Sequence, residues 1–329
     1  MYSELDGLIN NNVWFRYFIE IYNNRVRDKG GWIDFESEIS HIIKNLDSAR
    51  HTLKEQLNEG KTVAEMTPAQ YGSLEKFFFM LFGKLYEKLD DPIFYLRHQI
   101  CIKHLLNKEY IKFIKNKSIN DLNNLIRCLE IYLSDYISFD QCIPLKDIAE
   151  LHIDGVLSFN YTDTYKLLYD TPNSNIEYDF IHGKADLSKN VEECSLVLGI
   201  DEYLSGEEKN KDNEFIQFKK FYQRIYKGTG CHYKDWLHGY MGGLNQRIPN
   251  VYIYGHSLDV TDADILRQLI LTKGATTTIF YHNKDAMGSQ IANLVKVIGE
   301  DELIKRTDGS HPTIIFKQSS TETVKTVDV

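Results

Sequence analysis

Residues 155–163 read GVLSFNYTD, and this stretch decides the fold. An apolar run of strand length passes directly into Asn160 and further polar residues, as expected where a buried strand ends. Two later stretches repeat the arrangement: residues 176–183 read IEYDFIHG and residues 251–258 read VYIYGHSL. In a parallel α/β sheet, the ligand crevice lies at the carboxyl ends of the strands. We therefore expect a binding site at these three strand ends.

The rest of the chain divides into a helical part and an alternating part. Up to about residue 150 the apolar residues recur at helical spacing, as in Trp14, Phe18 and Tyr22 or in Phe35, Ile39, Ile42 and Leu46. Later, amphipathic helices alternate with short apolar runs at 155–159, 177–181, 195–200, 250–254, 276–281 and 312–317. Such alternation predicts an α/β fold with a mainly parallel sheet. The expected domains are a helical portion at 1–150, an α/β core at 151–318 and a flexible tail at 319–329.

Two helix starts are predicted inside the helical part. Thr67 followed by Pro68 is typical of an N-cap with proline at the first helical position. Ser118 with Asp121 predicts the start of another helix.

Charge and composition exclude several classes of protein. With 329 residues and a net charge of −9, the chain can form a large core and has no overall electrostatic attraction to nucleic acid. The densest basic run, Lys112, Lys115 and Lys117, is more typical of a solvated helix end than of a binding site. No segment reaches the ~18 consecutive apolar residues of a membrane span, and the start resembles no signal peptide. We expect a cytoplasmic protein without membrane contact.

The five cysteines are an odd number at wide spacing, which argues against a zinc ribbon. They are interpreted as reduced and mostly buried thiols, and no metal is predicted.

A phosphate-binding turn is missing from the sequence. No G-x-G-x-x-G occurs, and Gly60-Lys61-Thr62 is not a Walker motif because Glu55 stands where its first glycine must be. The first strand and Gly-rich turn of a doubly wound nucleotide-binding domain are therefore not visible.

Asn160 is the first candidate site residue. Its amide can both donate and accept hydrogen bonds, which suits orientation of a ribose hydroxyl or a water. The alternative on local grounds is an Asx turn or a cap of the helix starting near Thr162 or Asp163. Asp163 is a candidate supporting partner.

His182 is the best placed of the 11 histidines. Gly183 lets the backbone turn away, which we expect to leave the imidazole exposed at the strand end as a general base. A surface or structural role is the default for most histidines. His238-Gly239 repeats the dipeptide within an amphipathic helical pattern and is assigned to structure.

The loop at 255–258 is the third candidate. Gly255 and Ser257 could present backbone amides and a hydroxyl to a phosphate or ribose. Asp262 and Asp264 would favour the following helix start without any ligand. The acidic residues that follow Trp32 are expected in the first turn of a helix, where they favour the positive end of the helix dipole. Among them, Glu36 is kept as a candidate catalytic carboxylate.

Five short motifs, in order, resemble the AbiH family of bacterial abortive-infection proteins. They are Gly31-Trp32-Ile33-Asp34-Phe35-Glu36, Phe159-Asn160-Tyr161-Thr162, His182-Gly183, Leu198-Gly199-Ile200 and Tyr254-Gly255-His256-Ser257-Leu258 through Asp262. The resemblance covers most of the chain and implies a role in bacteriophage resistance.

That family is distantly similar to the sirtuin superfamily, which implies a sirtuin-like or Rossmann-like sheet and NAD as substrate or ligand. By this analogy His182 activates a ribose hydroxyl or water, Asn160 orients it, and Gly255, Ser257 and Asp262 contact the cofactor. NAD hydrolysis is the expected chemistry, because the paired cysteines of the zinc-binding deacetylases are lacking.

The family usually opens with a strand leading into Gly-Asn-Gly-Phe-Asp, and this sequence begins after that point. We therefore expect a truncated start or a lost phosphate site. In the second case the protein is a non-catalytic sensor or partner-binding module. A nuclease fits poorly, since no clear cluster of metal-binding acids is present. The candidate partners are a nucleotide, a phage-derived trigger and further copies of the chain.

Overall fold

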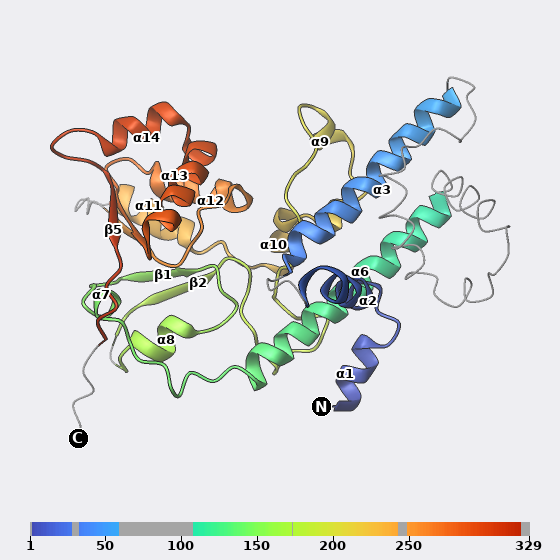
Figure 1. Cartoon of the computed structure of the whole chain (residues 1–329), viewed down its shortest axis with the longest axis horizontal. Helices are drawn as coiled ribbons and strands as arrows, with labels where there is room; N and C mark the ends of the chain where they lie inside the picture. Colours follow the sequence, from blue (N-terminus) through green and yellow to red (C-terminus); the bar gives the residue numbers. More distant parts are fainter. Residues whose placement is uncertain (1, 28–32, 59–107, 173, 243–248, 324–329) are drawn as a thin grey trace. The chain divides into compact units, whose positions relative to one another are not determined.

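The computed structural model describes residues 2–27, 33–58, 108–172, 174–242 and 249–323 (Figure 1). The chain forms two compact units: unit 1 comprises Met1–Ile137 and His182–Thr229, and unit 2 comprises Ser138–Ile181 and Gly230–Val329. Neither unit is one continuous piece of chain. The domain division at residue 150 stays a prediction.

Two sequence-based predictions concern residues that the structure does not describe. The helix expected from Thr67 lies outside the described residues, and so does the end of the tail, 324–329.

Unit 1 is built from helices. They are α1 (Tyr2–Ile9), α2 (Val13–Ile21), the π-helix η1 (Tyr22–Val26), α3 (Phe35–Asn58), α6 (Lys108–Asp135), α9 (Glu208–Lys211), the 3-10 helix η4 (Ile216–Phe218) and α10 (Lys220–Lys227). The predicted stripes are largely confirmed, because Trp14 and Phe18 on α2 and Ile39, Ile42 and Leu46 on α3 are buried. The large helical portion that the sequence predicts is therefore present.

The helix start predicted at Ser118 is wrong, because Ser118 and Asp121 lie in the middle of α6. Asp121 instead serves the start of α2: its Oδ2 accepts the backbone N–H of Val13 at 2.8 Å, and its carbonyl accepts from Asn12 Nδ2 at 2.7 Å. The Ser118 carbonyl accepts from Trp14 Nε1 at 2.8 Å. These polar residues therefore hold a different helix, distant in sequence, against α6.

The apolar run at 195–200 belongs to unit 1 and forms no strand, apart from one isolated bridge between Ile200 and Lys219. Its backbone groups are bound by α10 and the segment before it. Gln223 Oε1 accepts the N–H of Leu198 at 3.1 Å, and Gln223 Nε2 donates to the Leu198 carbonyl at 3.2 Å. The Ile200 N–H donates to the Phe218 carbonyl at 2.7 Å. With these partners the run needs no neighbouring strand.

Unit 2 carries two small parallel sheets. One pairs β1 (Gly155–Ser158) with β2 (Glu177–Phe180), and the other has the order β3-β4-β5, with β3 (Asn250–Ile253), β4 (Thr276–Tyr281) and β5 (Ile314–Gln318). Five of the six predicted apolar runs thus supply strands. The α/β class with parallel pairing is confirmed, although the described strands form two sheets.

Helices complete unit 2. They are α7 (Lys146–Ala149), α8 (Thr164–Tyr169), α11 (Tyr233–Gly242), the 3-10 helix η5 (Val260–Asp262), α12 (Ala263–Ile270), α13 (Lys284–Ile298) and α14 (Glu300–Thr307). The strands β3–β5 share a buried aliphatic core with α12, α13 and α14 that includes Ile253, Leu266, Ile279, Leu294 and Ile314. Such a core fixes the end of β3, where the loop at 255–258 begins. Within the described ranges, no helix is long and apolar enough to cross a bilayer.

Candidate functional site

Asn160 lies two residues beyond β1 and is exposed. The Ser158 hydroxyl fixes this turn, because it accepts the Asn160 backbone N–H at 3.1 Å and lies 3.1 Å from the Asn160 carbonyl. Asp163, not Asn160, occupies the N-cap position of α8, and its carbonyl accepts the Leu167 N–H at 2.9 Å. The amide side chain of Asn160 is thus left at the surface beside a rigid turn.

The loop at 255–258 follows β3 and is clamped from several sides. Gly255 has φ +69°, and Leu258 has φ +58° although its side chain is fully buried. The Nδ1 atom of His256 accepts the Leu258 N–H at 2.8 Å. From α13, Gln290 Nε2 donates to the His256 carbonyl at 3.1 Å and Asn293 Nδ2 donates to the Ser257 carbonyl at 2.9 Å.

One ring contact joins the two strand ends within unit 2. The rings of Phe159 and His256 meet edge to face at 4.4 Å, although β1 and β3 belong to different sheets. His256 Nε2 also lies 3.6 Å from Asp262 Oδ2. The segments that carry Asn160 and Ser257 are therefore brought together around an imidazole that the sequence analysis did not choose. Its signal was present, because His256 stands directly after an apolar run and a glycine.

Carboxylates already occupy the helix start beyond this loop. Asp262 is buried at the N-cap position of α12, and Asp264 lies in its first turn. The side chain of Asp259 accepts the Thr261 N–H at 3.1 Å. The positive end of the helix is compensated by these acids, which would repel a phosphate placed there. The arrangement suits a neutral hydroxyl better than an anion.

His182 is buried, so the expectation of an exposed imidazole is wrong. The reason is the tight packing of Gly183, where an added Cβ would lie 2.1 Å from the Ser195 carbonyl oxygen. The His182 carbonyl also accepts the Val197 N–H at 2.8 Å. The division between the two units falls directly before His182, whereas Asn160 belongs to unit 2. The sequence-based pairing of Asn160 with His182 therefore stays a prediction.

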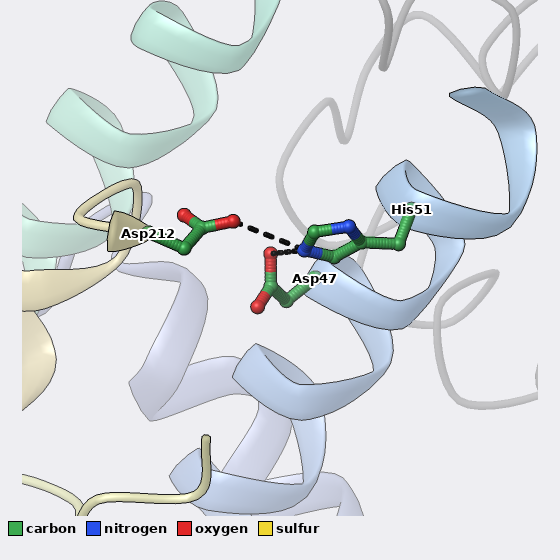
Figure 2. A group of neighbouring side chains, drawn as sticks. All are labelled: Asp47, His51 and Asp212. Atoms are coloured by element: carbon green, nitrogen blue, oxygen red, sulfur yellow. Dashed lines mark ion pairs between the residues drawn. The ribbon is translucent and has the colours of Figure 1, made fainter. Parts of the chain in front are cut away.

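A second group of polar side chains lies in unit 1 (Figure 2). Asp47 and His51 are four residues apart on α3, and Asp212 directly follows α9. His51 Nε2 lies 3.0 Å from Asp212 Oδ2 and 3.7 Å from Asp47 Oδ1. Two carboxylates and an imidazole are ligand types that zinc accepts.

An internal cation already occupies the centre of this group. Arg50 Nη2 lies 2.6 Å from Asp47 Oδ1 and 3.1 Å from His51 Nε2, and it also contacts Asp212 Oδ2. The Tyr203 hydroxyl donates to Asp47 Oδ2 at 2.9 Å. A metal would have to displace the guanidinium, so the group is interpreted as an ion-pair network that fastens α3 to the segment after α9.

Burial alone would raise the pKa of Asp212, but the Glu214 amide and the Arg50 guanidinium lower it below its ordinary value. Burial and the nearby Asp47 raise the pKa of the Tyr203 phenol. These shifts keep the carboxylate charged and the phenol protonated, as the hydrogen bonds require.

The remaining candidates have structural partners. Glu36 Oε2 forms an ion pair at 2.7 Å with the buried Lys220, and Lys115 forms one at 2.6 Å with Glu214. A structural role for Glu36 is therefore favoured.

Four cysteines are described, and all are free thiols. Cys194 is buried and Cys128 half-buried, whereas Cys142 and Cys231 are exposed. Only Cys194 of these four is buried, so the expectation of mostly buried thiols is wrong for the described cysteines. Burial raises the pKa of the Cys194 thiol to about 11, which makes this residue a poor nucleophile at neutral pH.

The comparisons with known proteins give one family. A family model described as "Bacteriophage abortive infection AbiH" matches residues 6–282, which is most of the 329-residue chain. No curated protein and no solved structure gives a significant match.

Proposed function

The chain belongs to the bacteriophage abortive infection AbiH family, and from this premise we propose that it acts by binding NAD in unit 2 and hydrolysing the bond between nicotinamide and ribose. Loss of the cofactor would stop the metabolism of the infected cell before phage can multiply.

The contact between Phe159 and His256 carries the proposal. It places the exposed turn after β1 beside the clamped loop after β3, and both are carboxyl ends of parallel strands. Ligands of open α/β folds bind at such ends. The exposed residues Asn160, Gly255 and Ser257 then supply an amide, an unhindered backbone and a hydroxyl to one ligand.

The reaction adds water across a glycosidic bond. The water oxygen bonds to the anomeric carbon of the ribose, the carbon–nitrogen bond breaks, and its electron pair returns to the pyridinium ring, which leaves as neutral nicotinamide. The water releases one proton to a base. Asn160 would orient the water or a ribose hydroxyl, with Asp163 as its supporting partner, and Asp262 would support the cofactor loop. The role of His182 as the base is what the sirtuin analogy implies, and His182 is not part of this site in unit 2.

The test is nicotinamide release from NAD by the purified full chain. We expect Asn160→Ala to lower the rate by at least about tenfold, which corresponds to the loss of roughly one hydrogen bond in the transition state. Asn210→Ala, an exposed asparagine of unit 1, is the matched control and should match the wild type. Background release by all three proteins would dismiss hydrolysis, and calorimetric titration with NAD would then show whether binding remains.

A non-catalytic partner-binding module is the second candidate, and one observation favours it. The helix α10 buries its polar residues Lys220 and Gln223 but exposes Ile225 by 78% and Tyr226 by 76%. Exposed apolar side chains on one helix are typical of a contact surface. Phage protection that survives the double change Asn160→Ala and His182→Ala, but is lost with Ile225→Asp, would support this candidate over hydrolysis.

A further inference from the structure

The loop after β3 holds a conformation that its sequence alone would not choose. Leu258 has φ +58°, which costs a non-glycine residue about 1–2 kcal/mol. Its side chain is nevertheless fully buried in the core beneath β3. A strained residue persists only where its surroundings hold it, and such residues cluster at functional sites.

His256 is the side chain that holds it. Because the Leu258 N–H donates to Nδ1, the neutral ring carries its own proton on Nε2, the nitrogen that faces Asp262 Oδ2 at 3.6 Å. Phe159 packs against the ring. The imidazole is thus fixed by a backbone donor, a carboxylate and an aromatic ring.

The carbonyls of this loop define where its amides point. The carbonyls of His256 and Ser257 both accept hydrogen bonds from α13. In a trans peptide the carbonyl and the following N–H point in opposite directions, so the N–H groups of Ser257 and Leu258 point away from α13. His256 binds the second of these amides. The N–H of Ser257 points away from α13 in a residue that is exposed, and we infer that it is the one available to a ligand.

We propose that His256 is the positioning residue of the nucleotide site, and that it holds the N–H and hydroxyl of Ser257 toward a ribose hydroxyl of the ligand. The acids Asp259, Asp262 and Asp264 beyond the loop oppose a phosphate there. This inference rests on the proposed function for its ligand, but its geometric part stands on unit 2 alone.

Three substitutions separate the interactions of the imidazole. His256→Asn keeps an acceptor that reaches the amide two residues on, as in an Asx turn. His256→Gln places its amide near the former Nε2 position and loses that acceptor, and His256→Ala loses both. His311→Ala, an exposed histidine of unit 2, is the matched control.

The first measurement is the dissociation constant for NAD with the full chain. We expect His256→Asn to stay within about threefold of the wild type and His256→Gln and His256→Ala to bind about tenfold more weakly, as for one lost hydrogen bond. Inorganic phosphate should not compete. Wild-type affinity in His256→Ala, or competition by phosphate, would overturn the inference.

The second measurement needs no ligand. Hydrogen exchange at the Leu258 amide should be slow in the wild type, in His256→Asn and in His311→Ala, and fast in the other two variants. If the wild type fails to bind NAD but this pattern is found, the proposed function fails while the positioning role stands. Equal exchange in wild type and His256→Ala would refute the role, and thermal melting of each variant shows that it is folded.

Discussion

Gln223 binds both backbone polar groups of Leu198: Oε1 accepts the N–H at 3.1 Å and Nε2 donates to the carbonyl at 3.2 Å. One glutamine on a helix thereby replaces the neighbouring strand that an apolar run usually requires. The same Nε2 also donates to the Gln217 carbonyl at 3.2 Å.

Gln223→Leu should destabilise the protein strongly. The change leaves the buried N–H and carbonyl of Leu198 without their partner, and each such group costs about 1–3 kcal/mol. We expect the free energy of unfolding to fall by about 2–5 kcal/mol in urea titrations of the full chain. Gln217→Leu changes an exposed side chain and should have a small effect. Equal losses in the two variants would contradict the importance of this contact.

Gly183→Ala should prevent correct packing of the segment around His182. The added Cβ would lie 2.1 Å from the Ser195 carbonyl oxygen, in addition to the strain of φ +78°. Gly309 has a similar φ, +86°, with nothing within 4 Å of the new atom. Gly309→Ala should therefore cost only about 1–2 kcal/mol. A melting temperature for Gly183→Ala equal to that of Gly309→Ala would show that the clash is relieved.

Arg50→Ala should convert the ion-pair network into a metal site. Without the guanidinium, Asp47, His51 and Asp212 present three donor atoms to one vacated point. We expect the variant to melt at a lower temperature than the wild type and to be stabilised by added zinc, while the wild type gains little. The double variant Arg50→Ala, His51→Ala loses one donor and should respond less. An equal response to zinc in the two variants would exclude these ligands.

Asp212 should contribute to stability in a pH-dependent way. Because its pKa in the folded state is below the ordinary value of 3.8, its contribution is fully present above that pH and is lost as the pH falls through the folded pKa. Asp212→Asn should therefore be less stable than the wild type at pH 7, with a difference that shrinks in acid. Asp140→Asn, an exposed aspartate bonded to Ser138, serves as control and should show a much smaller difference. Chemical unfolding measured across the acid range tests both.

The local pattern of apolar and polar residues predicted most of the described secondary structure. The runs that became β1 to β5 were visible because a strand needs only a few consecutive apolar residues between turns. The stripes through Trp14 and Ile39 were visible for the same local reason. The failures share one cause, namely partners distant in sequence: Asp121 caps a helix more than one hundred residues before it, and Gln223 binds the run at 195–200.

The site was predictable only in part. Polar residues after strands pointed to Asn160 and to the loop at 255–258, because the ends of parallel strands are a general place for ligands. The burial of the His182 ring and the contact of the His256 ring with Phe159 could not be predicted from the sequence, because both depend on how the chain folds. The grouping of Asp212 with Asp47 was equally invisible, because it arises only on folding.

The interleaving of the two units has a consequence during synthesis on the ribosome. Unit 1 cannot be completed until residue 229 has emerged, because α10 and the segment that it holds follow β1 and β2 along the chain. The nascent N-terminal helices must therefore wait for their partners while the first segment of unit 2, Ser138–Ile181, is translated. Any fragment that stops near residue 150 would lack the second segment of unit 1, His182–Thr229, and would leave the helices incomplete.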